Sequence, residues 1–146
     1  MGDKANGEIN IAASKAAIID VVVDLDRYPE WADGVKAAEV TERYPDGRTK
    51  TGRFTFVSGP IKDTFVLEYE YDGDDQVSWK LSEGHVINQE EGNYTLTDDG
   101  DGNVHVVYNL EVGINLPVPG LIKRQAAKHI VHTALTGLKK RVESLQ

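Results

Sequence analysis

The last thirty residues constrain the fold more than any other part of the chain. After about seventy residues in which apolar and polar positions alternate, apolar residues recur every three or four positions, which places them on one side of an α-helix. The predicted helix runs from about Gly120 to Leu145, nearly 40 Å at a rise of about 1.5 Å per residue. Its apolar stripe consists of Ala127, Ile130, Val131, Ala134, Leu138, Val142 and Leu145. Such a helix needs a sheet to lie across, and the space between them holds either a filled core or a cavity.

Residues 35–114 are predicted to form a run of antiparallel strands. Turn clusters rich in Gly, Pro and Asp divide this region into sequential hairpins at 45–47, 58–60, 72–75, 83–85 and 98–103. The two-residue period sorts the side chains onto two faces. The inner face is predicted to carry most of the aromatic and aliphatic residues, together with Asp63, Asn88 and Glu90. The solvent-exposed face is predicted to carry Lys62, Glu68, Glu70, Lys80, His105, Asn109 and Glu111.

The first third of the chain is predicted to contain a strand and two short helices. Residues 8–13 form the strand, and Ser14 is placed to cap the N-terminus of a first helix. Pro29 suits the first turn of the second helix, and Gly34 is expected to end it.

Composition indicates a single domain covering residues 1–146. A chain of 146 residues with a net charge of −8 buries a substantial core and repels phosphate backbones, so we expect no nucleic-acid partner. The chain has no cysteine, which excludes disulfides, thiolate catalysis and cysteine-ligated zinc. No signal peptide and no stretch of about twenty apolar residues is present, so we expect a cytoplasmic protein without stable membrane insertion.

The charge is unevenly distributed along the chain. From Gly120 onward there are six basic residues and one acid, so this segment carries +5 and the rest carries −13. One interpretation is that the basic residues offset an acidic sheet and complement the helix C-terminus dipole. The other is that they attract an anionic ligand or the headgroups of a membrane, which would allow transient membrane contact.

Three segments resemble one known superfamily. They are residues 24–31 with Val35 following, residues 92–96, and Leu116-Pro117-Val118-Pro119 ahead of residues 138–143. With the order strand, two short helices, six strands and a long helix, the chain resembles the SRPBCC (START-like) superfamily. Within it, the chain is similar to the actinobacterial polyketide cyclase/dehydrase and lipid-transport family.

The resemblance implies an α+β helix-grip fold. It implies a seven-stranded antiparallel curved sheet around the C-terminal helix, with two short helices after the first strand and a cavity for lipids, polyketides, quinones or other hydrophobic molecules. Family members that cyclise polyketides often place an arginine inside this cavity. The predicted faces put Arg53 outside, which leaves Arg124 as the comparable residue and argues against cyclase activity.

The predicted ligand-binding residues face the space between sheet and helix. As pure core, the aromatic residues would simply stabilise the fold. As the lining of a cavity, tyrosine hydroxyls would orient a ligand opposite the small alanines of the helix. The predicted set is Tyr28, Trp31, Phe54, Phe56, Phe65, Leu67, Tyr69, Trp79, Tyr94, Tyr108, Leu110, Ala127, Val131 and Ala134.

The candidate catalytic residues are Asp63, Glu90 and Arg124. Desolvation of an inward carboxyl would raise its pKa and make it a general base. A structural role for Asp63 and Glu90 is the alternative, because a bulge at Gly92 would shift which face the neighbouring residues occupy. No metal site is expected, since the four histidines are scattered and residues 98–103 fit a hairpin turn better than a calcium loop.

The leading hypothesis is binding, and conceivably transport, of a lipid, polyketide or isoprenoid in the internal cavity, without a cofactor. The competing hypothesis is a cyclase/aromatase or dehydratase in which Asp63, Glu90, Tyr94 or Arg124 moves protons. A third is a partner-binding module with a filled core. The sequence is compatible with a monomer or a homodimer.

Overall fold

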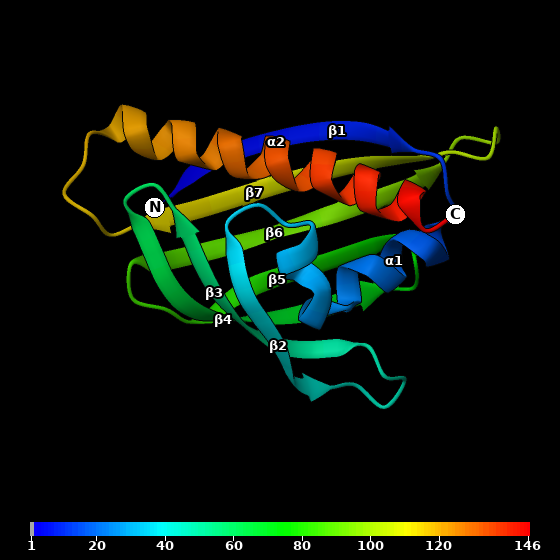
Figure 1. Ribbon diagram of the computed structural model, residues 1–146, viewed down its shortest axis with the longest axis horizontal. Helices are drawn as coiled ribbons and strands as arrows, with labels where there is room; N and C mark the ends of the chain where they lie inside the picture. Colours follow the sequence, from blue (N-terminus) through cyan, green and yellow to red (C-terminus); the bar gives the residue numbers. More distant parts are fainter. Residues whose placement is uncertain (1) are drawn as a thin grey trace.

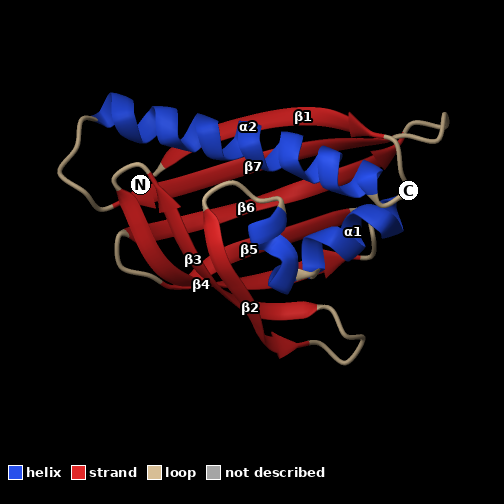
Figure 2. Ribbon diagram, in the orientation of Figure 1, coloured by secondary structure: helices blue, strands red, loops and turns tan. Residues whose placement is uncertain are grey.

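The protein forms one curved antiparallel sheet with helices on its concave face (Figures 1 and 2). The computed structural model describes residues 2–146, so Met1 lies outside the described residues. The strands are β1 (Asp3–Ile11), β2 (Val35–Arg43), β3 (Thr49–Ser58), β4 (Ile61–Asp72), β5 (Gln76–Glu83), β6 (Ile87–Asp98) and β7 (Val104–Ile114). The helices are α1 (Lys15–Val23), the 3₁₀ helix η1 (Leu25–Glu30) and α2 (Gly120–Ser144).

The strand order is β1-β7-β6-β5-β4-β3-β2. Strands β2 to β7 follow one another as hairpins, and β1 closes the sheet by pairing with β7 from Asp3↔Val112 to Ile11↔Val104. This is the predicted helix-grip architecture of seven antiparallel strands, two short helices and a long terminal helix, and the prediction is confirmed.

Helix α2 lies along β1 and β7 because small residues let its backbone approach the sheet. A Cβ atom at Gly7 of β1 would come within 3.0 Å of the Val131 and Leu135 side chains. The helix buries Ala127, Val131, Leu135, Leu138 and Val142 completely or nearly so. Leu135 was missing from the predicted stripe, and Leu145 was wrongly included, because the helix ends at Ser144 and Leu145 is exposed.

The N-terminal region differs from the prediction in two places. Strand β1 begins at Asp3 rather than Glu8, because its inward positions near the start are Ala5 and Gly7, which give a weak apolar signal. Ser14 caps α1 as predicted, its hydroxyl accepting from the Ala17 N–H at 3.1 Å. Pro29, however, lies in the last turn of η1 rather than the first, and the helix ends before Gly34, which adopts a left-handed φ of 86° in the next turn.

Strand β6 also departs from the predicted register. The irregularity lies between Ile87 and Gln89, not at Gly92, which pairs regularly with Leu110. The shift leaves Asn88 exposed instead of inward. From Glu90 onward the strand returns to the predicted alternation, with Tyr94 and Leu96 buried.

Candidate ligand site

An apolar cavity lies between the concave face of the sheet and α2. Its volume is about 120 Å³. An engineered cavity of about 150 Å³ lined by Leu, Ile and Phe holds benzene, so this one is close to the size of a single six-membered ring. The side chains of sheet and helix therefore leave a space that no protein atom fills.

Most of the predicted ligand-binding residues line this cavity. These are Tyr28, Trp31, Phe54, Phe56, Phe65, Leu67, Tyr69, Trp79, Tyr94, Tyr108, Leu110 and Ala134. Ala127 and Val131 do not, because they lie on the side of α2 that contacts β1. The helix instead presents Ile130, Thr133 and Ala134 to the cavity, and these residues lie on the neighbouring face of α2.

Several lining residues were missed by sequence reasoning. Ile130 carried a signal as a member of the apolar helix stripe, and Val112 alternates with outward residues on β7. Ile87 was missed because the register shift between Ile87 and Gln89 takes it out of phase with the rest of β6. No sequence pattern indicated that residues 32–35 line the cavity, because their position depends on the path of the chain after η1. The additional lining residues are Val22, Ala32, Asp33, Val35, Ile87, Val112, Ile130 and Thr133.

The aromatic residues form a continuous cluster around Trp79. Tyr94 and Tyr108 pack at 4.7 Å between ring centroids, and the Trp79 ring lies 5.1 Å from Tyr94 and 5.7 Å from Tyr108. Gly92 makes room for this indole, since a Cβ there would approach the Trp79 ring to 3.1 Å and the Asn109 carbonyl oxygen to 2.4 Å. The absence of a side chain at Gly92 thus allows Trp79 to lean over β6.

Glu90 is the acidic group that this arrangement holds inside the sheet. The indole Nε1 of Trp79 donates a hydrogen bond to the Glu90 carboxylate at 2.8 Å. Desolvation raises the pKa of Glu90 to about 7, although the bond from Trp79 opposes the rise. A carboxyl with this pKa exchanges a proton near neutral pH, which is the property of a general acid or base.

Three tyrosine hydroxyls share the cavity with Glu90. The rings of Tyr69, Tyr94 and Tyr108 are buried, and among residues 2–146 their hydroxyls have no hydrogen-bond partner, yet each retains some accessible surface. Tyr28 differs, because its hydroxyl donates to the Val22 carbonyl. Burial raises the pKa of Tyr69, Tyr94 and Tyr108, so all three remain neutral donors at physiological pH.

Residues 31–35 and the middle of α2 meet at one side of the cavity. Trp31, Asp33 and Val35 approach Ile130 and Ala134 there. Two contacts hold the segments together: His129 Nε2 lies 3.3 Å from the Asp33 carboxylate, and Arg141 lies 3.0 Å from Glu30. These segments therefore form one wall of the cavity.

The family described as polyketide cyclase / dehydrase and lipid transport matches residues 3–143. The chain belongs to this family. The resemblance to the START-like superfamily is thereby confirmed. No curated protein sequence matches the chain.

Solved structures of the same superfamily share the fold. A START superfamily protein from Mycobacterium smegmatis is 26% identical over 99% of this chain and 100% of its own, with a TM-score of 0.88. An aromatase/cyclase from Streptomyces sp. R1128 is 10% identical over 98% of this chain and 94% of its own, with a TM-score of 0.74. A STAR-related lipid transfer protein from Xanthomonas axonopodis is 17% identical over 96% of this chain and 85% of its own, also with a TM-score of 0.74.

Unlike Glu90, the other two candidate catalytic residues lie outside the cavity in this family member. Asp63 is buried, but its carboxylate accepts hydrogen bonds from the N–H groups of Thr64 at 2.9 Å, His85 at 3.0 Å and Ile87 at 2.8 Å. Desolvation opposes ionisation, yet these bonds hold the pKa of Asp63 below its usual range. Arg124 is exposed on the first turns of α2. Asp63 therefore anchors the 84–86 turn, and the three candidates do not converge on one site.

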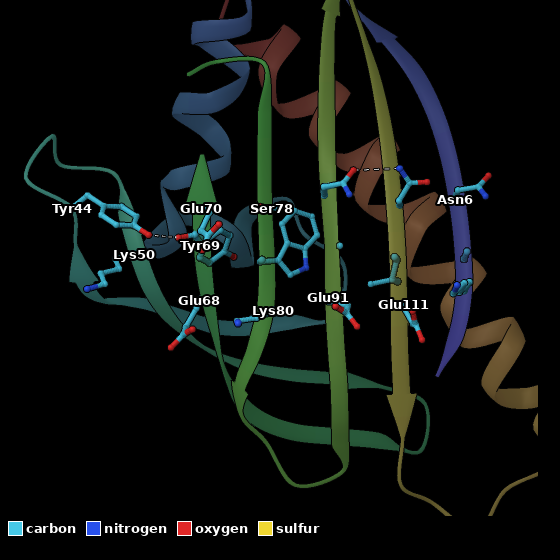
Figure 3. Close-up of a pocket in the computed structure, with 17 residues that line it drawn as sticks. Asn6, Tyr44, Lys50, Glu68, Tyr69, Glu70, Ser78, Lys80, Glu91 and Glu111 are labelled. Carbon is cyan, nitrogen blue, oxygen red and sulfur yellow. Dashed lines mark hydrogen bonds between the residues drawn. The ribbon is translucent and has the colours of Figure 1, made fainter. Parts of the chain in front are cut away.

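The outer face of the sheet carries a larger groove, of about 740 Å³, with a different character (Figure 3). Its walls are polar, and charges of opposite sign occupy facing positions, as where Lys80 lies between Glu68 and Glu91 across three strands. Figure 3 shows these side chains standing on the surface away from α2. The groove lies on the predicted solvent-exposed face, and its lining carries three lysines and four glutamates.

Residues 2–146 also lack the features of a metal centre and of a membrane-spanning helix. No group of three or more His, Asp or Glu side chains there is placed to hold a metal ion. Residues 98–103 form a hairpin turn in which Asp99 accepts from the N–H groups of Asp101 and Asn103. None of the helices described is long and apolar enough to cross a bilayer.

Proposed function

We propose that the protein binds a small hydrophobic molecule in the cavity between the sheet and α2. The observation that carries this proposal is the 120 Å³ space, lined almost wholly by aromatic and aliphatic side chains. Apolar cavities of this size stay dry and gain free energy when an apolar molecule enters. Membership of a family described by lipid transport as well as cyclisation supports a hydrophobic ligand.

Toluene is the simplest probe of this proposal, because it matches the cavity in size and has no polar group. Titrated against the ¹⁵N-labelled protein, it should give saturable shifts at residues such as Phe65, Tyr108 and Ile130. Ala134→Leu fills the cavity from α2 and should abolish those shifts. The same substitution at exposed Ala16 of α1 is the matched control and should leave them intact. Linear, non-saturating shifts in the unmodified protein would contradict the proposal.

Transport would additionally require contact with a membrane, and one end of α2 has the composition for it. Leu121 and Ile122 are exposed large apolar side chains, and they lie beside Lys123, Arg124 and Lys128. The first turn of α2 contains no acidic residue. Apolar side chains flanked by cations favour a bilayer surface with anionic lipids.

Sedimentation with vesicles tests this contact. The protein should co-sediment with phosphatidylserine-containing vesicles at low salt. It should stay in the supernatant with vesicles of pure phosphatidylcholine. Leu121→Ser with Ile122→Ser should abolish the binding. If the double variant sedimented with the phosphatidylserine-containing vesicles as much as the unmodified protein does, this end of α2 would have no role in membrane contact.

Glu90 supports a second candidate, an enzyme that cyclises or dehydrates its ligand. A carboxyl with a pKa of about 7 inside the cavity has the proton affinity of a general base. This candidate predicts that a polyketide-like substrate turns over in the presence of the protein and that Glu90→Gln stops turnover without preventing binding. Recovery of the substrate unchanged would leave binding as the function.

A further inference from the structure

The cavity has one polar end and one apolar end. Glu90 and the rings of Tyr69, Tyr94 and Tyr108 gather around Trp79, on strands β4 to β7, and Glu90 is close enough to each tyrosine hydroxyl for its charge to raise the pKa of that hydroxyl. Toward the other end the lining is mostly apolar, with Phe54, Phe56 and Phe65; apart from Tyr28, the other polar side chains of the lining are Asp33 and Thr133. A ligand without any polar atom would leave these four polar groups without new partners.

Unpartnered hydroxyls are costly in an apolar space, which makes the polar end informative. Tyr69, Tyr94 and Tyr108 are each at most 7% exposed, and all three line the cavity. Burying a hydroxyl without a hydrogen bond costs on the order of 1 to 3 kcal/mol in proteins. The arrangement therefore favours a ligand that supplies hydrogen bonds at this position.

The charges facing Glu90 determine which polar group fits. The ionisable groups that line the cavity are Tyr28 from η1, Tyr69 from β4, Tyr94 from β6, Tyr108 from β7 and Asp33 from the segment before β2. Helix α2 contributes only Ile130, Thr133 and Ala134, none of which ionises, and no Lys, Arg or His is among the lining residues. A carboxylate entering this space would meet Glu90 with no cation to balance either charge.

We propose, on the basis of the proposed binding function, that the ligand carries an uncharged ring hydroxyl that binds at the polar end of the cavity. The hydroxyl donates to the Glu90 carboxylate and accepts from one or two of the tyrosine hydroxyls, while its ring fills the apolar end. The 120 Å³ volume matches one ring of this kind. Phenolic or cyclic alcohol groups of larger molecules satisfy the same requirement, and fatty-acid carboxylates do not.

Phenol, toluene and benzoate test this proposal, because they share one ring and differ only in the substituent. At pH 8, where Glu90 is ionised, phenol should bind about fivefold more tightly than toluene, the equivalent of one net hydrogen bond. Benzoate should bind at least about tenfold more weakly than phenol. Its affinity should rise as the pH falls from 8 to 6 and Glu90 becomes protonated.

Glu90→Gln provides the decisive variant, since glutamine keeps the shape and removes the charge. Phenol should lose its advantage over toluene, and the pH dependence of benzoate binding should disappear. Glu91→Gln is the matched control, because Glu91 is the next residue of β6 and points to the outer face; it should behave like the unmodified protein.

The outcomes separate this proposal from the function on which it rests. Equal binding of phenol and toluene by the unmodified protein overturns the polar-end proposal while leaving the hydrophobic cavity in place. A phenol preference that survives in Glu90→Gln overturns it as well. Failure of both toluene and phenol to bind overturns the binding function itself, and with it the polar-end proposal.

Discussion

At the scale of single residues, Glu90 is the carboxyl group whose pKa is raised by burial. Its pKa of about 7 means that the folded protein holds a proton that the unfolded chain releases near pH 4.5. Between these two values the folded state binds more protons than the unfolded state. Stability contributed by protonated Glu90 is therefore present below pH 4.5 and is lost as the pH rises toward 7.

We predict that Glu90→Gln makes the protein more stable than the unmodified chain at pH 8, by about 2 to 3 kcal/mol. The variant avoids burying a charge and keeps an oxygen that accepts from Trp79. Urea denaturation at pH 5 and pH 8 measures the effect. The two proteins should differ little at pH 5, and an equal difference at both pH values would contradict this explanation.

Asp63 has the opposite electrostatic character, because three backbone N–H groups stabilise its charge. We predict that Asp63→Asn lowers the free energy of unfolding by about 1 to 3 kcal/mol at pH 7, since an amide has one accepting oxygen and an NH₂ group that faces donors. Chemical denaturation checks this, with Asp101→Asn in the exposed 98–103 turn as the control. The stabilisation by ionised Asp63 is lost as the pH falls through its lowered pKa. The difference in free energy of unfolding between the variant and the unmodified protein should therefore become smaller in acid.

At the scale of elements, η1 with residues 31–35 covers one side of the cavity, where Trp31 packs on Gly137 of α2 and two ion pairs add polar contacts. Arg141 and Glu30 form an ion pair that is half-exposed, worth less than about 1 kcal/mol. We predict that Glu30→Gln speeds amide hydrogen exchange at residues 31–35 without a measurable change in global stability. Glu39→Gln, which breaks the comparable exposed pair with Arg53 at 2.6 Å, should leave exchange in this segment unchanged. Equal exchange in both variants would show that Arg141 does not hold the segment.

The element scale also shows which parts of the structure the sequence predicts. Alternation over 49–114 places most of the inner face correctly, because strands β3 to β7 each bury one side; Asn88 is an exception, and β2 has no buried residue. Strand β1 begins earlier than predicted because Ala5 and Gly7 suit close contact with α2 rather than strong apolar burial. Residues 32–35 line the cavity through the path of the chain after η1, and no residue pattern encodes that path.

At the scale of the whole molecule, the curvature of the sheet and the size of residues on α2 together decide whether the core is filled. Large side chains from the helix at Leu135 and Leu138 close the space over β1 and near α1, whereas Ala134 leaves it open opposite the aromatic rings. The sequence predicted the helix and the rings but not the volume between them, because a volume depends on distances that spacing does not fix. The cavity is thus a property of the assembled fold.

Xenon tests the central claim most directly, because it enters dry apolar cavities of this size and avoids polar, hydrated ones. A crystal of the protein should be pressurised with the gas and its diffraction measured. We predict a xenon site among Phe65, Tyr108, Ile130 and Ala134, and its loss in Ala134→Leu. Side chains packed through this region with no xenon, or an ordered cluster of water molecules in its place, would contradict the claim.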